Sequence, residues 1–371
     1  MKLYLLSAAI MSTAILSPLS GQIKPAVLHP AAVSSDSTQQ PVLTQGETSI
    51  RPMRDAETDS HLQGNRGSVA GSFNWFSLTS NFWHRSRAGG AFIDGSFFLI
   101  GGEIDSATYG TSRARTVEVF DPFTLTWRAS LVEMPIGVSN ISGGVAAVDD
   151  NIYVFGGWKE DSTRSNAIQV YNGTTDSWSI HATAMPEAIY GCVAVAVGQN
   201  RIFVCGGSKN AGLGGAGTGN AYFFDTLTGT ITLTTPMTAA RFLHSADVEG
   251  STIYVAAGYG TGTAFESFDT ATEAWTTLPS IPVDRAGCGI AAVGDYCVFY
   301  GGDWSGYRND CNVYDSVAGS FDAFLGAKLG TMPLGKRSFA YADIQLPWIR
   351  ALAAMDGWRT NNYTGNCTVL L

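Results

Sequence analysis

Residues 147–157 read AVDDNIYVFGG, and this stretch decides the fold because its pattern recurs along the chain. An apolar strand leads through a tight polar turn into a second apolar strand, which ends in a pair of small residues. Further copies end at Gly102, Gly207, Gly258, Gly302 and, in a divergent form, Gly357. Successive copies are 44 to 55 residues apart. A period of this length is typical of proteins that are built from one repeated structural unit.

A second phrase follows each copy. It reads VEVFD at Val117–Asp121, IQVYN at Ile168–Asn172, AYFFD at Ala221–Asp225, FESFD at Phe265–Asp269, CNVYD at Cys311–Asp315 and CTVLL at Cys367–Leu371. A large apolar residue stands six positions after the first five of these phrases, at Trp127, Trp178, Ile231, Trp275 and Phe321. Each unit is therefore expected to contain four short strands, joined by turn dipeptides such as Asp94-Gly95.

These phrases resemble the kelch repeat, in which about 50 residues form one four-stranded blade of a β-propeller. The resemblance rests on the glycine pairs, the dipeptides of an aromatic residue with Asp or Asn, and the downstream tryptophans. It extends from about residue 72 to residue 371. It implies an all-β fold, a six-bladed kelch-type β-propeller over residues 71–371, with no helix of consequence. A kelch fold by itself does not specify a function.

The first and last repeats are each incomplete, and together they predict how the propeller closes. The chain ends at Leu371, within the third strand of the sixth unit, so that unit has no fourth strand of its own. An isolated strand phrase, FNWFSL at residues 73–78, precedes the first unit. We expect this N-terminal strand to complete the last blade, which would leave no sheet edge exposed between the two ends.

The N-terminal residues lie outside the repeats. Residues 1–21, MKLYLLSAAIMSTAILSPLSG, combine Lys2 with a short apolar stretch and a small-residue end, which predicts a signal peptide. Residues 22–70 are rich in Ser, Thr, Gln and Pro and predict a disordered linker or propeptide. We therefore expect a secreted protein, or a periplasmic one in a bacterium. An uncleaved signal anchor is the alternative.

Composition excludes several classes of partner. The chain has 371 residues, of which 14% are charged, and a net charge of −9 without any basic block. Nucleic acids and anionic membrane surfaces are therefore not expected partners. The body of the chain has no apolar run long enough for a transmembrane helix, so no membrane insertion is expected after signal cleavage. We expect a monomer.

Candidate binding residues are expected on one face of the propeller, called the upper face, where second strands connect to third strands and successive blades connect to each other. Arginines near the start of first strands would surround the upper mouth of the central channel, at Arg87, Arg241, Arg285 and Arg337. Candidate loop residues are Tyr259, Trp304, Tyr307 and Arg308. Guanidinium groups favour carboxylates, and the kelch resemblance implies an acidic peptide at such positions. The alternative is structural, with arginines bonding nearby carbonyls and tryptophans covering the ends of the core.

The function expected from these features is recognition of a protein or carbohydrate ligand, including an anionic one, through the upper face. The alternative is a secreted carbohydrate-active enzyme. A sugar-acid mutarotase would use Glu103 or Asp303 in acid–base chemistry beside the arginines. A copper-radical oxidase would need two histidines, two tyrosines and a linked cysteine, but His84, His181 and His244 fall on different blades. No cofactor, metal ligand or catalytic residue is assigned, and the chain is interpreted as a binding protein rather than an enzyme.

Six cysteines, an even number in a chain expected to be exported, suggest disulfides or buried thiols. Cys192 and Cys205 are the candidate pair, because they would be diagonal neighbours in one hairpin if Val197 faced Ile202. Sequons for N-linked glycosylation stand at Asn140, Asn172, Asn362 and Asn366.

Overall fold

The computed structural model describes residues 73–106, 110–210, 215–304, 306–346, 349–359, 362–363, 365 and 367–370. The chain divides into two compact units, Met1–Glu47 and Thr48–Leu371, and every described residue belongs to the second. The signal peptide expected at residues 1–21 and the linker expected at residues 22–70 lie outside the described residues.

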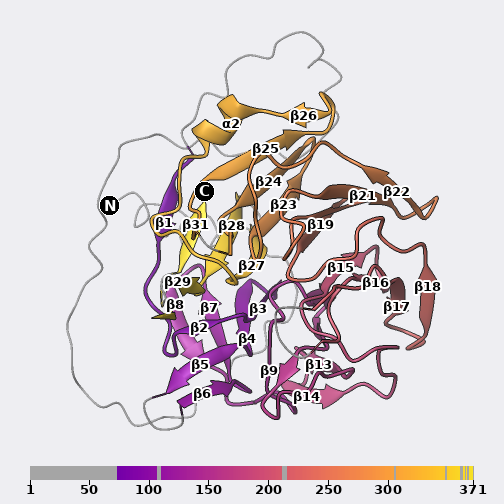
Figure 1. Ribbon diagram of the computed structural model, residues 1–371. Coiled ribbons are helices and arrows are strands. Elements are labelled where there is room, and N and C mark those ends of the chain that lie inside the picture. The colour runs from indigo at the N-terminus through magenta and orange to yellow at the C-terminus, as the bar shows by residue number, and fades with distance from the viewer. Residues whose placement is uncertain are drawn as a thin grey trace, which may run out of the picture. The chain divides into compact units, whose positions relative to one another are not determined.

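Four-stranded antiparallel sheets repeat along the chain (Figure 1). Blade 1 consists of β3 (Gly89–Ile93), β4 (Ser96–Ile100), β7 (Val117–Asp121) and β8 (Thr126–Ala129). Blade 2 consists of β10 (Val145–Val148), β11 (Asn151–Phe155), β13 (Ile168–Asn172) and β14 (Ser177–Ile180). Blade 3 consists of β15 (Val193–Val197), β16 (Arg201–Cys205), β17 (Ala221–Asp225) and β18 (Ile231–Thr234).

The second half of the propeller repeats the arrangement. Blade 4 consists of β19 (Ser245–Glu249), β20 (Thr252–Ala256), β21 (Phe265–Asp269) and β22 (Ala274–Thr277). Blade 5 consists of β23 (Gly289–Val293), β24 (Tyr296–Tyr300), β25 (Cys311–Asp315) and β26 (Ser320–Phe321). Blade 6 consists of β27 (Ala340–Leu346), β28 (Ile349–Met355), β31 (Thr368–Leu370) and β1 (Trp75–Ser77). The six-bladed all-β propeller is confirmed.

The N-terminal strand closes the propeller, as the incomplete repeats predict. Strand β1 pairs antiparallel with β31, with Trp75 opposite Leu370 and Ser77 opposite Thr368. The innermost strands contact each other in the cyclic order β3, β10, β15, β19, β23, β27 and back to β3. Each sheet therefore packs between two neighbours, and apolar clusters fill the spaces between the blades.

A circle of backbone hydrogen bonds joins the blades where the first strands begin. The bonds, 2.6 to 3.1 Å long and written donor to acceptor, run from Arg87 to Ser338, Ile141 to Arg87, Gly191 to Asn140, Leu243 to Gly191, Gly287 to Leu243 and Ser338 to Gly287. One residue of each blade in this circle has a left-handed φ of 52° to 67°, and these residues are called the axial ring: Arg87, Asn140, Gly191, Leu243, Gly287 and Ser338. A left-handed residue turns the backbone sharply, so the groups beside it can reach both adjacent blades.

Four residues of the axial ring line a small cavity. This cavity has a volume of about 10 Å³, and its lining also includes Gly143, Cys192, His244 and Tyr341. This volume is close to the lower limit for one water molecule. This cavity is therefore too small for any larger ligand.

Short sheets extend the connections above the blades. A three-stranded sheet joins β2 (Arg85–Ser86), β5 (Glu103–Ser106) and β6 (Gly110–Arg113). Two-stranded sheets pair β9 (Val138–Ser139) with β12 (Trp158–Lys159), and β29 (Trp358–Arg359) with β30 (Asn362–Tyr363). These sheets fix the upper-face loops, so side chains on them have defined positions.

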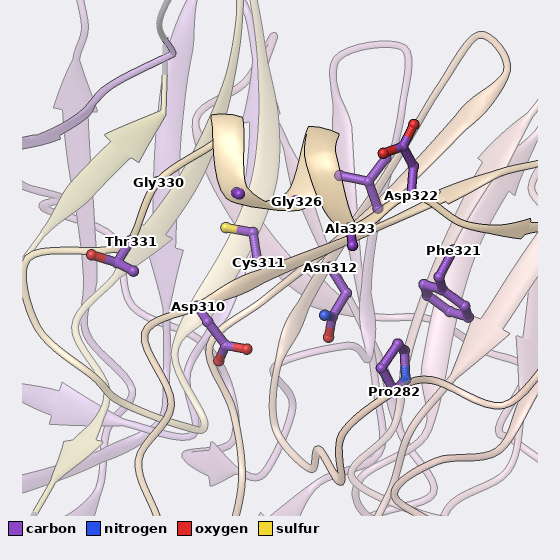
Figure 2. A pocket seen from close by; sticks show the side chains of 12 residues that line it. Pro282, Asp310, Cys311, Asn312, Phe321, Asp322, Ala323, Gly326, Gly330 and Thr331 are labelled. Atoms are coloured by element: carbon purple, nitrogen blue, oxygen red, sulfur yellow. The ribbon is translucent and has the colours of Figure 1, made fainter.

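Blade 5 departs from the repeat at its outer edge. Strand β26 has only two residues, and the six-residue helix α2 (Ala323–Lys328) follows it. Asp322 caps this helix by accepting a 2.9 Å hydrogen bond from the Leu325 N–H. Between α2, Pro282 and strand β25 lies a hollow of about 400 Å³ (Figure 2). Within the described residues α2 is the only α-helix, and it is far too short to span a membrane.

The suggested bridge between Cys192 and Cys205 is not formed, and all six cysteines are buried free thiols. The observed register places Val193 directly opposite Cys205, and Val197 opposite Arg201 rather than Ile202. The two cysteines belong to different apolar clusters, Cys192 between blades 2 and 3 and Cys205 between blades 3 and 4. Because neighbouring residues of a strand face opposite sides of a sheet, the two thiols point away from each other.

The sequons have different surroundings. Asn140 belongs to the axial ring and is only 4% exposed, so its amide is not accessible to a glycan in the folded protein. The prediction of glycosylation at Asn140 is therefore wrong for the native fold. Asn172 ends β13 and is half-buried, and its Oδ1 accepts hydrogen bonds from Thr175. The backbone of Asn362 lies in β30, and Asn366 lies outside the described residues.

Candidate functional site

Three arginines stand two positions before the axial ring, at Arg85, Arg241 and Arg285, and all three are fully buried. Each donates from Nη1 to a carbonyl sixteen residues later. The acceptors are Gly101 at 2.8 Å, Ala257 at 3.5 Å and Gly301. The prediction that Arg241 and Arg285 surround the channel mouth is therefore wrong. Their guanidinium groups point into the blade, where the chain between second and third strands has carbonyls without a ladder partner.

A polar residue in the third strand of the same blade also binds each of these arginines. The arginine, its carbonyl acceptor and this polar residue are together called an arginine anchor. Arg85 forms a 2.5 Å ion pair with Glu118, and Arg241 forms one with Glu266. Arg285 donates to Asn312 at 2.8 Å. Burial lowers the pKa of Arg241 and raises that of Glu266, while their mutual attraction opposes both shifts. These groups fix the connections within a blade.

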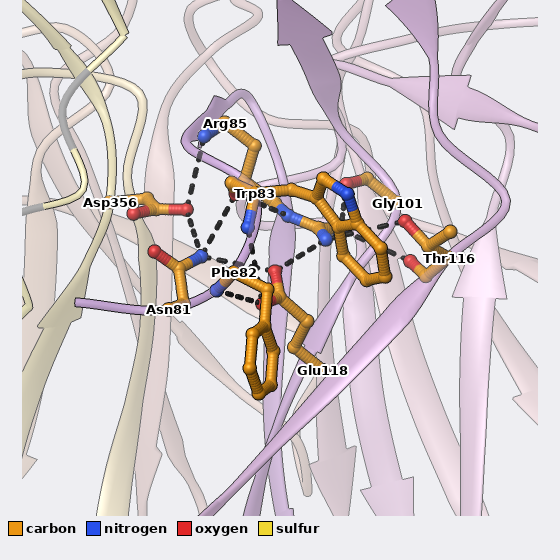
Figure 3. Close-up of polar contacts among 8 residues, drawn as sticks. All are labelled: Asn81, Phe82, Trp83, Arg85, Gly101, Thr116, Glu118 and Asp356. Carbon is orange, nitrogen blue, oxygen red and sulfur yellow. Dashed lines mark hydrogen bonds and ion pairs between the residues drawn. The ribbon is translucent and has the colours of Figure 1, made fainter. Parts of the chain in front are cut away.

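The same anchor extends across the closure between blades 6 and 1 (Figure 3). Asn81 donates to Oε2 of Glu118 at 3.1 Å and to Oδ2 of Asp356 at 2.6 Å. The backbone N–H of Arg85 also donates to Asp356, at 3.1 Å. Asp356 stands where most other repeats have the first glycine of the pair, and burial raises the pKa of its carboxyl. This cluster is structural.

Another set of side chains lies in the upper-face connections and beside the axial ring. Five aromatic residues from blades 2 to 5, called the aromatic row, follow one another in the order Trp158, Tyr190, Phe242, Tyr259 and Trp304. The centroids of successive rings are 4.9, 5.6, 5.4 and 5.1 Å apart. Tyr190 and Phe242 are fully buried, whereas the other three are half-buried. The row therefore combines rigid apolar surface with an accessible edge.

An arginine stacks on each end of the aromatic row. The guanidinium carbon of Arg337 lies 3.7 Å from the ring centroid of Trp304, and that of Arg164 lies 4.9 Å from Trp158. Among the residues that the structure describes, Nε and Nη1 of Arg337 and Nε and Nη2 of Arg164 are buried without a hydrogen-bond partner. Arg337 is only 6% exposed. Burial lowers its pKa, a hydrogen bond with Tyr307 opposes this shift, and the nearby charge of Arg87 adds to it.

Blades 6 and 1 supply the polar side of the mouth. Arg87 of the axial ring lies 5.6 Å from the ring of Trp358 and forms an ion pair with Glu103. The other carboxylate oxygen of Glu103 lies 3.3 Å from Arg113 Nη2. Ser139 donates to that same oxygen at 3.4 Å. The mouth thus has an apolar side on blades 2 to 5 and a charged side on blades 6 and 1.

Comparison with known proteins bears on this architecture. The family described as KLHDC2/KLHL20/DRC7 Kelch-repeats domain matches residues 88–302 and 143–343. The chain belongs to this kelch-repeat family. The chain is thus one kelch propeller, in which the glycine pairs end the second strands, the blades form a ring and the N-terminal strand closes that ring.

Several Kelch-like proteins are similar to this kelch propeller over part of their length. Kelch-like protein 38 of Homo sapiens is 28% identical over 213 residues, which cover 55% of this chain and 33% of the relative. Kelch-like protein terF of Aspergillus terreus is 32% identical over 188 residues, covering 44% of this chain and 39% of the relative. Kelch-like protein 35 of Mus musculus is 31% identical over 133 residues, covering 36% and 21%. The chain thus matches about two-fifths or less of each relative.

The kelch propeller brings together most, but not all, of the predicted binding residues. Tyr259, Trp304, Tyr307 and Arg337 lie together at the end of the aromatic row, and the charge of Arg87 acts on Arg337. Arg308 instead forms a 2.7 Å ion pair with Asp310, which also contacts buried Arg285.

Sequence reasoning did not single out Tyr190, Phe242 and Arg164. Tyr190 and Phe242 both stand one position before the axial ring, as Arg337 does, and this shared position was the available signal. To use this signal, one must know which residue of each repeat belongs to the axial ring. Residue spacing alone defines that position only to within one or two residues.

The residues considered for enzymatic chemistry have other surroundings. Both oxygens of Glu103 are engaged by arginines. Burial lowers the pKa of Arg337, and the charge of nearby Asp303 partly opposes that shift. His244 is buried, with Nε2 3.9 Å from the Cys205 sulfur. Among the described residues, no group of three His, Cys, Asp or Glu side chains is placed to hold a metal ion.

Proposed function

We propose that this kelch propeller is an interaction protein that binds a protein partner through the upper mouth, with Arg337 receiving a carboxylate of that partner. The observation that carries the proposal is a pair of buried donors on Arg337 that have no hydrogen-bond partner among the described residues. The guanidinium carbon of the same side chain lies 3.7 Å from the ring centroid of Trp304. A buried charged donor without a partner is unfavourable in the free protein, and an anionic ligand would satisfy it.

The aromatic row supports a peptide rather than an isolated anion. Half-buried rings of Trp158, Tyr259 and Trp304 offer flat apolar area beside the charge, and they lose little side-chain entropy on binding. Arg164 at the far end also has two donors without a partner among the described residues, so a second polar group of the peptide would have a partner there. Kelch-like relatives support a role in protein interaction, and no specific observation favours a carbohydrate.

The proposal includes export. Residues 1–21 have the composition of a signal peptide, so the partner would be a protein of the exported compartment or the cell surface. Detection of the chain in the culture medium, and its retention in the cell when residues 2–21 are deleted, would test this part separately.

Binding is tested by comparing Arg337→Ala and Trp304→Ala with a matched control. Arg128→Ala is suitable, because Arg128 lies exposed on the outer strand β8 of blade 1. The folded full-length proteins are immobilised, and proteins retained from the medium of the producing cells are identified by mass spectrometry. We expect partners that the native and Arg128→Ala proteins retain and the two mouth variants lose. Equal retention by all four proteins would refute the proposed site.

A further inference from the structure

We infer that the Glu103 carboxylate competes with acidic ligands for Arg87 and Arg113. The mouth therefore selects peptides with a single carboxylate, which binds at Arg337. This inference rests on the proposed function, since it concerns the selectivity of the same site. It starts from the observation that the charged side of the mouth contains one carboxylate held between two arginines.

The Glu103 carboxylate binds the donors that a ligand carboxylate would otherwise bind. One oxygen contacts Arg87, and the other lies 3.3 Å from Arg113 and 3.4 Å from the Ser139 hydroxyl. The Glu103 side chain is 8% exposed, whereas those of Arg87 and Arg113 are 15% and 17% exposed. Two guanidinium groups and a hydroxyl around a carboxylate are the donors that an acidic peptide would otherwise use.

Arg87 is also fixed where a ligand would meet it. Its backbone N–H donates to Ser338 at 2.6 Å, and its carbonyl accepts from Ile141 at 3.1 Å, so the residue is part of the axial ring. Its guanidinium carbon lies 5.6 Å from the ring of Trp358, and the Trp358 backbone N–H donates to the Arg337 carbonyl at 2.9 Å, so both arginines lie next to one tryptophan. Without Glu103, the mouth would therefore present Arg87 and Arg337 together to an anion.

Arg337 and Arg87 thus differ in availability although they face the same mouth. Arg87 is already paired, whereas two donors of Arg337 have no hydrogen-bond partner in the described part of the chain. A ligand with several carboxylates would have to displace Glu103 or bear its repulsion. A ligand with one carboxylate next to apolar side chains avoids both costs, because it uses Arg337 and the aromatic row.

The test uses three dansyl peptides and measures fluorescence anisotropy at one fixed, low ionic strength. Gln-Gln-Gln-Leu with a free C-terminus carries one carboxylate, Glu-Glu-Glu-Leu carries four, and amidated Gln-Gln-Gln-Leu carries none. On the native full-length protein, we expect the tetra-acid to bind no more tightly than the mono-acid. In Glu103→Gln, the tetra-acid should bind at least about tenfold more tightly, while the mono-acid changes less than about threefold.

Control variants separate this mechanism from a general change of charge. Glu133→Gln removes an exposed carboxylate that is paired with Arg115 at 3.7 Å, and it should leave all three affinities unchanged. Arg87→Ala combined with Glu103→Gln should abolish the gain. Glu103→Asp, which retains the charge but shortens the reach, should give a smaller gain and provides a second variant if Glu103→Gln folds poorly.

The inference is overturned if neither Glu103 variant tightens binding of the tetra-acid, or if the gain persists without Arg87. The proposed function fails in a different way, namely if the mono-acid binds no better than its amide or if Arg337→Ala leaves its affinity unchanged. The two failures are therefore distinguishable in one set of titrations.

Discussion

Asn81 donates a 2.6 Å hydrogen bond to Asp356 and so joins two residues that are 275 positions apart in the chain. Asn81 lies between the closing strand β1 and blade 1, and Asp356 follows β28 of blade 6. The bond lies at the joint where the last blade meets the first. The same Asn81 nitrogen also reaches Glu118 and the carbonyl of Trp83, so one side chain links three segments.

Asn81→Ala should lower the free energy of unfolding by about 1–3 kcal/mol, because it removes donors from two buried carboxylates. Urea denaturation followed by tryptophan fluorescence measures this change. Asn220→Ala is the control, since Asn220 makes an exposed side-chain bond to Glu187, and we expect an effect below about 0.5 kcal/mol. Equal effects of the two substitutions would show that the joint does not depend on Asn81.

Trp75→Ala tests the closing strand itself. The Trp75 ring lies 5.5 Å from that of Tyr300 and packs against the apolar cluster of blades 4 to 6. Its loss should lower the free energy of unfolding by about 2 kcal/mol or more. Leu131→Ala serves as the comparison, because Leu131 is 96% exposed and should have almost no effect. A native-like midpoint for Trp75→Ala would contradict closure by β1.

Arg241→Met should destabilise the fold rather than act on binding. It leaves the Glu266 carboxylate buried without its ion-pair partner, and breaking a buried pair in this way costs about 3–5 kcal/mol. The double variant Arg241→Met with Glu266→Gln should recover part of the loss, because it removes the unpaired charge. Circular dichroism melts of both variants measure the difference. If Arg241→Met melts like the native protein and only binding is lost, the original mouth interpretation of Arg241 is correct.

His244 should make stability fall in mild acid. Burial holds its pKa well below the usual 6.5, so the native state keeps it neutral while the unfolded chain takes up a proton. Its contribution is therefore fully present above about pH 6.5 and is lost as pH falls toward the folded pKa. At pH 5.5 this loss amounts to about 1.4 kcal/mol relative to pH 8.

His244→Leu should remove that part of the acid dependence. The measurement is the free energy of unfolding by urea for both proteins at pH 8 and pH 5.5, compared as a difference of differences. Carboxyls with raised pKa, such as Glu266, act in the opposite direction, but they are common to both proteins and cancel. Identical pH profiles would show that His244 is not buried neutral.

The sequence by itself determined the repeat, and with it the strands, their number and the closing strand. Gly102, Gly157 and their equivalents mark where each second strand ends, because the backbone there takes a left-handed turn that glycine adopts without strain. Trp127 and Trp178 mark the outer strands, because a large ring there packs on the aromatic residue of the third strand. Such signals are local in the chain, so spacing alone reveals them.

Only the tertiary structure decided where the arginines point. Arg85 and Arg87 are two residues apart, yet one is buried against Glu118 and the other faces the mouth. Arg241 aligns with Arg85, whereas Arg337 stands one position before the axial ring, and no spacing in the sequence distinguishes these positions. The direction of a long side chain depends on which unpaired carbonyls, carboxylates and rings the folded chain brings within its reach. These partners lie 16 to 33 residues away within blade 1 for Arg85, and on a neighbouring blade for Arg337. The first set comes within reach only when the blade has folded, and the second only when the blades have packed together.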